Sequence, residues 1–318
     1  MVNPDEKTAP EDDAHGPDTD GLAVGEDLSV EPSRELVAVQ NVPKRKGIHP
    51  FWLAVGRGAT SFGVATARGA KWTAALAAEA YKAVDPDVRR HAFHAPLVGM
   101  THLTGAPKPI SGLPDDGHPP VICVHGLVGH PGNFAGLRGY LRIMGRSRTY
   151  AIPQPAGRRI PELGADVSDA IRKVFEVNDL DDDAQVDVVA HSRGGLATRY
   201  ALLDPDIARR VRRLITLGTP HQGTLAARYG GNDQTLDLRP DSEVLRGIEE
   251  QIPWPAPPFP ELTTLGSDAD MLLLPATTCT VPGATHVDLP GLTHLSFLLH
   301  PRAFHRVWNA LDADAPCP

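Results

Sequence analysis

The most constraining feature of the sequence is residues 185–203 (QVDVVAHSRGGLATRYALL), where an apolar run passes through a tight turn into an amphipathic one. Residues 186–190 are short, apolar and mostly β-branched, which predicts a buried strand of a parallel sheet. Leu196, Tyr200 and Leu203 recur at spacings of four and three, which predicts a helix with one apolar face. The chain therefore has to fold a helix straight back over a strand.

Ser192 lies in the turn between this strand and this helix. A residue in such a sharp turn is expected to adopt a positive φ, which is unfavourable for any residue with a Cβ. The close approach of helix and strand requires small neighbours of the serine. Gly194 meets this requirement, and Ala190 nearly does. The first N–H groups of the helix are aimed at the same place, where an anion is favoured.

Strand and helix patterns alternate from about residue 119 onward. Strands are predicted within residues 119–126, 148–155, 185–190, 211–220, 261–267 and 277–291, and helices at 133–144, 161–177 and 296–311 besides the one after Ser192. Such alternation predicts an α/β fold, a mostly parallel sheet of about six strands covered by helices on both faces. Functional residues are then expected at the carboxyl ends of the strands.

Charge and composition divide the chain into three predicted parts. Residues 1–45 carry 11 acidic and 4 basic side chains with few large apolar residues, which predicts a disordered acidic tail. Residues 46–95 carry 7 basic and 3 acidic side chains and predict an Ala/Gly-rich helical extension. Residues 96–318 are expected to form the catalytic domain, whose mildly acidic balance argues against nucleic acid as a partner.

Residues 48–84 leave two interpretations open. Small residues recur every fourth position, a spacing that lets helices pack closely on the domain or on a second copy of the chain. The positive charge of the same residues also suits a basic amphipathic helix that lies peripherally on an anionic membrane surface. The oligomeric state follows from neither.

The sequence contains no clear targeting segment and no clear pattern of metal ligands. The start of the chain is mixed and acidic rather than basic and then apolar, so a secretory signal peptide is not expected and a cytoplasmic location is. No apolar run is long enough for an ordinary membrane span. The three cysteines form no disulfide or metal pattern, and we interpret the spacing of His91 and His94 as chance, since no third ligand is evident.

Three motifs together resemble the α/β-hydrolase superfamily, in particular bacterial lipases and esterases. Residues 190–194 (AHSRG) resemble the G-x-S-x-G nucleophile elbow with Ala in place of the first Gly. His125-Gly126 directly follows a predicted strand, and residues 218–223 (GTPHQG) follow the strand after the elbow. The resemblance covers about residues 119–301 and implies the α/β-hydrolase fold, with Ser192 as the nucleophile.

The family's order of catalytic residues is serine, then an acid, then histidine. His294, in the loop before the last predicted helix, resembles the catalytic histidine, whereas His286, His300 and His305 lie within or beside predicted elements. The resemblance implies Asp270 as the acid, because the family pattern of an Asp three residues before an apolar residue and five before a Pro fits Asp270, Leu273 and Pro275, with Asp268 as the alternative. The resemblance further implies an oxyanion hole made by the backbone N–H groups of Leu127 and Arg193.

The implied activity is that of a serine carboxylester hydrolase, a lipase or esterase that cleaves acyl ester or lipid substrates through an acyl-enzyme. Neither a metal nor an organic cofactor is expected. Two alternatives remain open at this point: an acyltransferase or thioesterase with the same triad, and a non-catalytic α/β-hydrolase scaffold. The acyl chain length and the alcohol half of the substrate are not encoded in any recognisable pattern.

Overall fold

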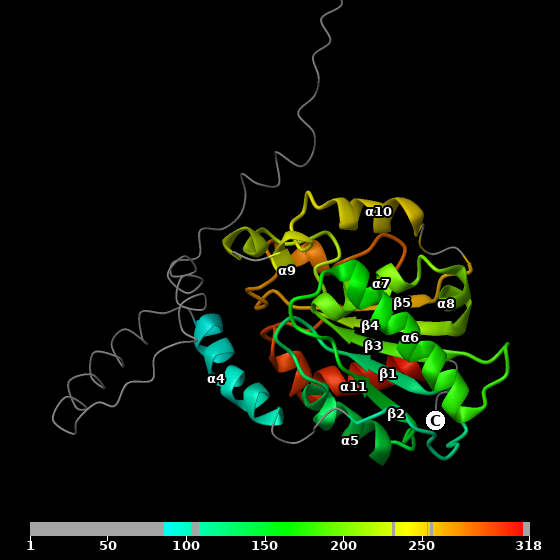
Figure 1. The fold of residues 1–318 in the computed structure, drawn as a ribbon. Helices are drawn as coiled ribbons and strands as arrows, with labels where there is room; N and C mark the ends of the chain where they lie inside the picture. Colours follow the sequence, from blue (N-terminus) through cyan, green and yellow to red (C-terminus); the bar gives the residue numbers. More distant parts are fainter. Residues whose placement is uncertain (1–85, 103–107, 231–232, 253, 255–256, 314–318) are drawn as a thin grey trace, which may run out of the picture. The chain divides into compact units, whose positions relative to one another are not determined.

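The computed structural model describes residues 86–102, 108–230, 233–252, 254 and 257–313. Its centre is a six-stranded, all-parallel sheet in the order β2-β1-β3-β4-β5-β6 (Figure 1). The strands are β1 (Val121–Val124), β2 (Thr149–Ile152), β3 (Val186–His191), β4 (Val211–Leu217), β5 (Glu261–Gly266) and β6 (Thr285–Asp288). The predicted parallel sheet of about six strands, flanked by helices, is confirmed.

Helices precede the sheet, connect its strands and follow it. The α-helices are α4 (Pro86–Thr101), α5 (Ala135–Ile143), α6 (Ile160–Asn178), α7 (Arg193–Ala201), α8 (Pro205–Arg210), α9 (Asp233–Leu236), α10 (Glu243–Gln251) and α11 (Pro301–Leu311). Within the described residues, four short 3-10 helices lie between them: η1 (Pro131–Phe134), η2 (Leu225–Tyr229), η3 (Ala276–Cys279) and η4 (Ser296–Leu298).

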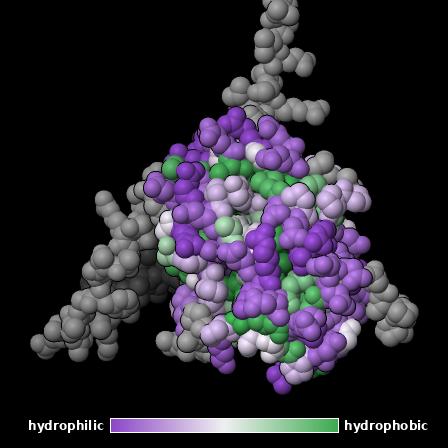
Figure 2. Space-filling model, turned by 45° about the vertical axis from the view of Figure 1, so that its right-hand side comes forward, coloured by the Kyte–Doolittle hydropathy of each residue, from purple (hydrophilic) through white to green (hydrophobic). Residues whose placement is uncertain are grey.

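The strands alternate between two hydrophobic cores because successive side chains of a strand point to opposite faces. In β1, Ile122 and Val124 pack with residues of α6, α7, α8 and α10 on one face. Val121 and Cys123 pack with residues of α4, α5 and α11 on the other face. Outside these cores, the face of the molecule drawn in Figure 2 is mostly hydrophilic.

Helix α6 begins at residues whose side chains suit a helix start. Pro161 occupies the first turn, where its missing N–H costs nothing, and a Glu162 carboxylate oxygen accepts a hydrogen bond from the Arg159 N–H at 2.9 Å. The helix ends at Asp179, which adopts a left-handed conformation with a φ of 51°. Its bounds agree with the predicted helix at residues 161–177 within one residue at each end.

Two predicted helices begin later than expected. The helix predicted at residues 133–144 starts as η1 and becomes α-helical only at Ala135, and the one predicted at 296–311 is split into η4 and α11. The split lies before Pro301, which has no N–H to donate and restricts the backbone of the preceding residue. The His300 side chain instead caps α11, because its Nδ1 accepts from the Arg302 N–H at 3.1 Å.

Helix α4 runs across residue 96, where the sequence analysis begins the catalytic domain. Its Val98 is buried in the core beside α5 and α11. The predicted acidic tail at residues 1–45 and the segment at 48–84 lie outside the described residues. Among the helices that the structure describes, none has the length and hydropathy needed to cross a membrane.

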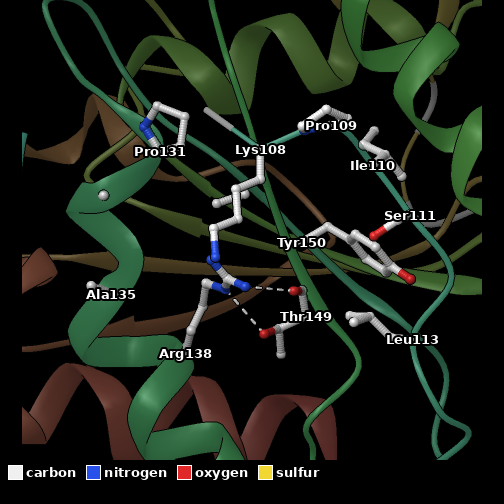
Figure 3. A pocket seen from close by; sticks show the side chains of 12 residues that line it. Lys108, Pro109, Ile110, Ser111, Leu113, Pro131, Ala135, Arg138, Thr149 and Tyr150 are labelled. Carbon is white, nitrogen blue, oxygen red and sulfur yellow. Dashed lines mark hydrogen bonds between the residues drawn. The ribbon is translucent and has the colours of Figure 1, made fainter. Parts of the chain in front are cut away.

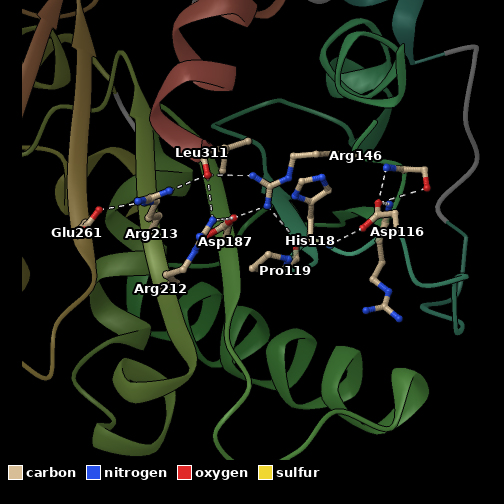
Figure 4. Close-up of polar contacts among 11 residues, drawn as sticks. Asp116, His118, Pro119, Arg146, Asp187, Arg212, Arg213, Glu261 and Leu311 are labelled. Carbon is tan, nitrogen blue, oxygen red and sulfur yellow. Dashed lines mark hydrogen bonds and ion pairs between the residues drawn. The ribbon is translucent and has the colours of Figure 1, made fainter. Parts of the chain in front are cut away.

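A buried cluster of charged side chains lies at the amino ends of strands β3 and β4 (Figure 4). The Asp187 carboxylate in β3 accepts from Arg146 at 2.6 Å and from Arg212 at 2.9 and 2.8 Å, and its side chain is 0% exposed. Both arginines, together with Arg213, also donate to the carbonyl oxygen of Leu311 at the end of α11. Cations are favoured at a helix C-terminus, so the cluster fastens α11 to the sheet.

We expect Asp187→Asn to lower the free energy of unfolding by about 3–5 kcal/mol, because it leaves buried arginines without their counter-charge. The control is Asp169→Asn, since Asp169 is 79% exposed and faces Arg172 at 3.5 Å on the surface. It should cost less than about 1 kcal/mol. Urea denaturation of both variants measures the difference, and equal losses would contradict the role of the cluster.

Candidate active site

The predicted site residues gather where the sheet's carboxyl ends meet their loops. Ser192 directly follows β3, and Gly126 follows β1. Asp270 lies in the loop after β5, and His294 lies between β6 and η4. Because the strands are parallel, these four loops emerge at one edge of the sheet.

Ser192 has the strained backbone that the sequence predicts, with a φ of 55° and a ψ of −127°. Its N–H donates to the Leu217 carbonyl at 2.9 Å, and its own carbonyl accepts from Thr219 Oγ1 at 2.9 Å. Both partners belong to β4 and the loop after it. The neighbouring strand therefore holds the turn in a conformation that the serine alone would avoid.

The turn leaves no room for a side chain at Gly194. A Cβ built on it would lie 2.5 Å from the Val124 carbonyl oxygen and 2.6 Å from that of His125. These distances are far inside van der Waals contact, so only glycine lets α7 start so close to the end of β1. The glycine brings the N-terminus of the helix, and Ser192 with it, against the loop that follows β1.

Asp270 and His294 form a direct pair. The Oδ2 atom of Asp270 lies 2.8 Å from Nδ1 of His294, and the two side chains are 0% and 5% exposed. The other carboxylate oxygen, Oδ1, accepts from the Leu272 N–H at 3.0 Å. The carboxylate is thus fixed by its own loop and directed at one ring nitrogen of the histidine, which leaves Nε2 as the nitrogen that can exchange a proton.

Asp268, the alternative acid, has a different role in the fold. It is exposed, and its Oδ1 accepts from the Gly291 N–H at 3.0 Å. That hydrogen bond is the main cause that lowers the pKa of its carboxyl below the usual value. Asp268 therefore ties the loop after β5 to the loop that carries His294, while Asp270 contacts the imidazole itself.

The serine and the Asp270–His294 pair meet at Gly218. A Cβ on Gly218 would lie 2.9 Å from Asp270 Oδ2 and 3.2 Å from His294 Nδ1, and the residue before it, Leu217, holds the Ser192 N–H. Within the described residues, Ser192 Oγ makes no hydrogen bond to His294. Such a contact is often loose without substrate and tightens only in the complex.

His191 was missed by the sequence analysis, although it directly precedes the serine. Its Nε2 lies 3.0 Å from the carbonyl oxygen of His294, and since a carbonyl only accepts, Nε2 carries the proton. Burial lowers its pKa well below the ordinary value, so the ring is neutral. His191 occupies the first x of A-x-S-x-G, a position that accepts any residue type, so the motif gave no signal for this role.

The loop after β1 is held by His125, whose ring is fixed at both nitrogens. Nε2 accepts from the Gln154 N–H at 3.0 Å, so Nδ1 carries the proton and donates to the Gly126 carbonyl at 3.0 Å. Burial lowers the pKa of His125 to about 4. The Gly129 N–H donates to the same carbonyl at 3.1 Å, which closes a tight turn over Leu127 and Val128.

The two predicted oxyanion donors flank Ser192. Arg193 follows it in sequence, and Leu127 follows Gly126, where a Cβ would lie 2.8 Å from Ser192 Cβ. Among the described residues, neither the Leu127 nor the Arg193 backbone N–H has a hydrogen-bond acceptor. Val128, next to Leu127, is β-branched yet has a φ of 57°, a strained conformation that this turn imposes.

The Arg193 side chain is buried and makes hydrogen bonds inside the protein. Its Nη1 donates to the Arg158 carbonyl and to Gln234 Oε1, both at 3.2 Å. Burial lowers the pKa of its guanidinium to about 10, and because this value is still well above 7, the side chain stays charged at neutral pH. Through Gln234 it ties the start of α7 to α9 in the connection between β4 and β5.

A cavity of about 240 Å³ lies away from these residues (Figure 3). It opens beside β2, where Lys108 and Arg138 point into it and Arg138 donates to Thr149. None of the predicted site residues lines it. In the part of the chain that the structure describes, no three His, Cys, Asp or Glu side chains gather as metal ligands.

Comparisons with known proteins agree with this architecture. A family described as a domain of unknown function (DUF7379) matches residues 162–246, which include the elbow. The mature lipase BlEst2 of Bacillus licheniformis superposes with a TM-score of 0.52 at 20% identity, over 64% of this chain and 96% of that one. Lipase B of Aspergillus fumigatus gives 0.53 at 20%, over 66% and 56%.

A metagenomic carboxyl esterase gives a TM-score of 0.50 at 17% identity, over 66% of this chain and 80% of that one. At such low identity the likeness establishes the fold. The chain thus has the α/β-hydrolase fold seen in lipases and esterases, as its motifs predict. The match to the fungal lipase spans little more than half of that protein's length.

We expect Gly218→Ala to disrupt the Asp270–His294 contact. Gly218 has a φ of 53°, which costs an alanine about 1–2 kcal/mol, and the new Cβ would press on both side chains. The control is Gly139→Ala in α5, where a Cβ meets nothing within 4 Å and should stabilise the helix by about 0.5–1 kcal/mol. Opposite shifts in the denaturation midpoint are expected, and a tolerated Gly218→Ala would contradict the geometry.

Proposed function

We propose that the chain is a serine carboxylester hydrolase, a lipase or esterase, with Ser192 as nucleophile, His294 as general base and Asp270 as the orienting acid. The observation that carries the proposal is the buried 2.8 Å contact between Asp270 and His294 beside a serine on a strained elbow. A buried carboxylate on one imidazole nitrogen leaves the other nitrogen free to take a proton, which a serine hydroxyl needs in order to attack.

The reaction follows from these positions. Nε2 of His294 takes the proton of Ser192 Oγ while Oγ bonds to the ester carbonyl carbon, and the carbonyl electron pair moves to its oxygen. The backbone N–H groups of Leu127 and Arg193 hold this oxyanion. When the carbonyl reforms, the bond to the alcohol oxygen breaks and His294 returns the proton to that oxygen. Water then repeats the sequence, which releases the acid and restores the serine.

Asp270 acts through the histidine. It accepts from Nδ1, which fixes the tautomer with a bare Nε2 and stabilises the imidazolium that forms during attack. His191 supports the same ring from the backbone side by donating to the His294 carbonyl. Among substrates we favour fatty acyl esters, which accords with the names of the structural neighbours, two lipases and a carboxyl esterase.

Hydrolysis of p-nitrophenyl esters from short to long acyl chains tests the proposal directly. We expect turnover by the wild type and a loss of more than about 1000-fold in kcat for Ser192→Ala, because no other group can form the acyl-enzyme. Circular dichroism controls for folding. Turnover that survives in Ser192→Ala would contradict the nucleophile, and a folded wild type without turnover at any length would leave acyl transfer or a scaffold role.

The two aspartates provide a matched pair of variants. Asp270→Asn should lower kcat by about 10⁴-fold, because an amide in place of the carboxylate favours the wrong histidine tautomer. Asp268→Asn should change kcat by less than about tenfold, since Asp268 bonds a backbone N–H and does not touch the imidazole. The reverse ranking would assign the acid to Asp268.

A further inference from the structure

Helix α4 lies against both loops that carry the proposed catalytic groups. It contacts η4, which follows His294, and η1, which follows the His125-Gly126 loop, and it runs beside α11 and α5 in Figure 1. It precedes every strand of the sheet in sequence and contributes none of the residues that the α/β-hydrolase resemblance assigns. Its polar contacts to these loops come from its middle, at His94, and from its last turn, at Val98 and Thr101.

The first contact is made by His94 at the histidine loop. Nδ1 of His94 lies 3.2 Å from Oγ1 of Thr293, the fully buried residue before His294. Ser296 Oγ donates to the Thr293 carbonyl at 2.8 Å, and Thr293 Oγ1 donates to Ser296 Oγ at 3.3 Å. The Thr293 hydroxyl proton is therefore committed, so this oxygen accepts from Nδ1–H of His94.

The second contact is made by Asn133 at the loop after β1. Its Nδ2 donates to Thr101 Oγ1 at 2.7 Å and to the Val98 carbonyl at 3.3 Å, both in the last turn of α4. Its Oδ1 accepts from the His130 N–H at 2.6 Å, directly after the turn that contains Leu127. One buried amide therefore joins the end of α4 to the loop of the proposed oxyanion hole.

The histidine loop is thus held from two sides. His191 donates to the carbonyl of His294, and His94 donates to the side chain of the residue before it. The Nε2 atom of a general base has to stay within about 3 Å of the serine oxygen, and misplacement by about 1 Å can cost 100-fold in rate. A side chain that fixes this loop acts on the rate without touching substrate.

We propose that α4 is a clasp that sets the distance between the general base and the oxyanion loop, with His94 as a positioning residue for His294. The proposal rests on the proposed function of Ser192, His294 and Leu127. Helix α4 contacts Thr293 through His94 near its middle and Asn133 through its last turn. It therefore couples two loops that follow strands β6 and β1, at different places in the sheet.

The electrostatics of α4 are compatible with this role. Burial lowers the pKa of His94, and the nearby His300 and Arg90 lower it further, so its ring is neutral at neutral pH. Nδ1 carries a proton in the neutral tautomer described above and also in the protonated ring, so the bond to Thr293 survives either state. Burial lowers the pKa of His91 on the same helix to about 4, which keeps another positive charge away from His294.

The test compares His94→Leu, which removes the donor, with His94→Asn, whose amide nitrogen can take the place of Nδ1. His94→Leu should lower kcat about tenfold with KM little changed, and His94→Asn should restore most of it. Thr293→Val should match His94→Leu, and the double variant should be no worse than either single one. Met100→Ala, an exposed residue of α4, is the control and should retain wild-type kcat.

Hydrogen exchange of residues 290–298 in the same variants separates this proposal from the proposed function. Faster exchange there in His94→Leu and Thr293→Val, but not in Met100→Ala, supports the clasp even if the wild type turns over no ester. Unchanged kcat and unchanged exchange in His94→Leu overturn it. If His94→Leu does not fold, Thr293→Val decides, and a failure of His94→Asn to recover exchange protection also counts against the clasp.

Discussion

The positive φ of Ser192 is the constraint on which the rest of the site depends. Two hydrogen bonds to β4 and the loop after it maintain this conformation: the Ser192 N–H donates to the Leu217 carbonyl, and the Thr219 hydroxyl donates to the Ser192 carbonyl. The absence of a side chain at Gly194 also allows it. Together they let α7 start directly over the end of β1 and leave the first N–H of the helix without an acceptor among the described residues. Without this turn the serine would be an ordinary strand-end residue.

The parallel sheet then brings the partners to the serine. Strands β1, β3, β4 and β5 are consecutive neighbours, so their loops form a continuous rim, and β6 adds the histidine loop at its edge. The Asp270–His294 contact joins the last two loops, and the buried cluster around Asp187 fixes the opposite ends of the strands. Residues far apart in sequence therefore meet because the sheet order dictates it, while short hydrogen bonds set their orientation.

Sequence patterns predicted what is local. The strand, the turn at Ser192 and the following helix come from one run of residues. The resemblance to the family pattern favoured Asp270 over Asp268 as the acid, and in the structure Asp270 contacts the imidazole. The patterns missed His191 and His94, because each acts on His294 or its neighbour from over 100 residues away. They also placed the start of the last helix too early, because hydrophobic spacing does not register the effect of Pro301.

The proposed hydrolase activity requires that His294 activates Ser192 in the folded chain. Labelling with a fluorophosphonate, followed by intact mass measurement and peptide mapping, tests it most directly, since such a reagent needs an activated serine rather than a particular ester. We expect one adduct per chain, on Ser192, that forms far more slowly in His294→Ala and not at all in denatured protein. Folded protein that stays unlabelled, or that carries its adduct on another residue, would rule out Ser192 as the activated nucleophile.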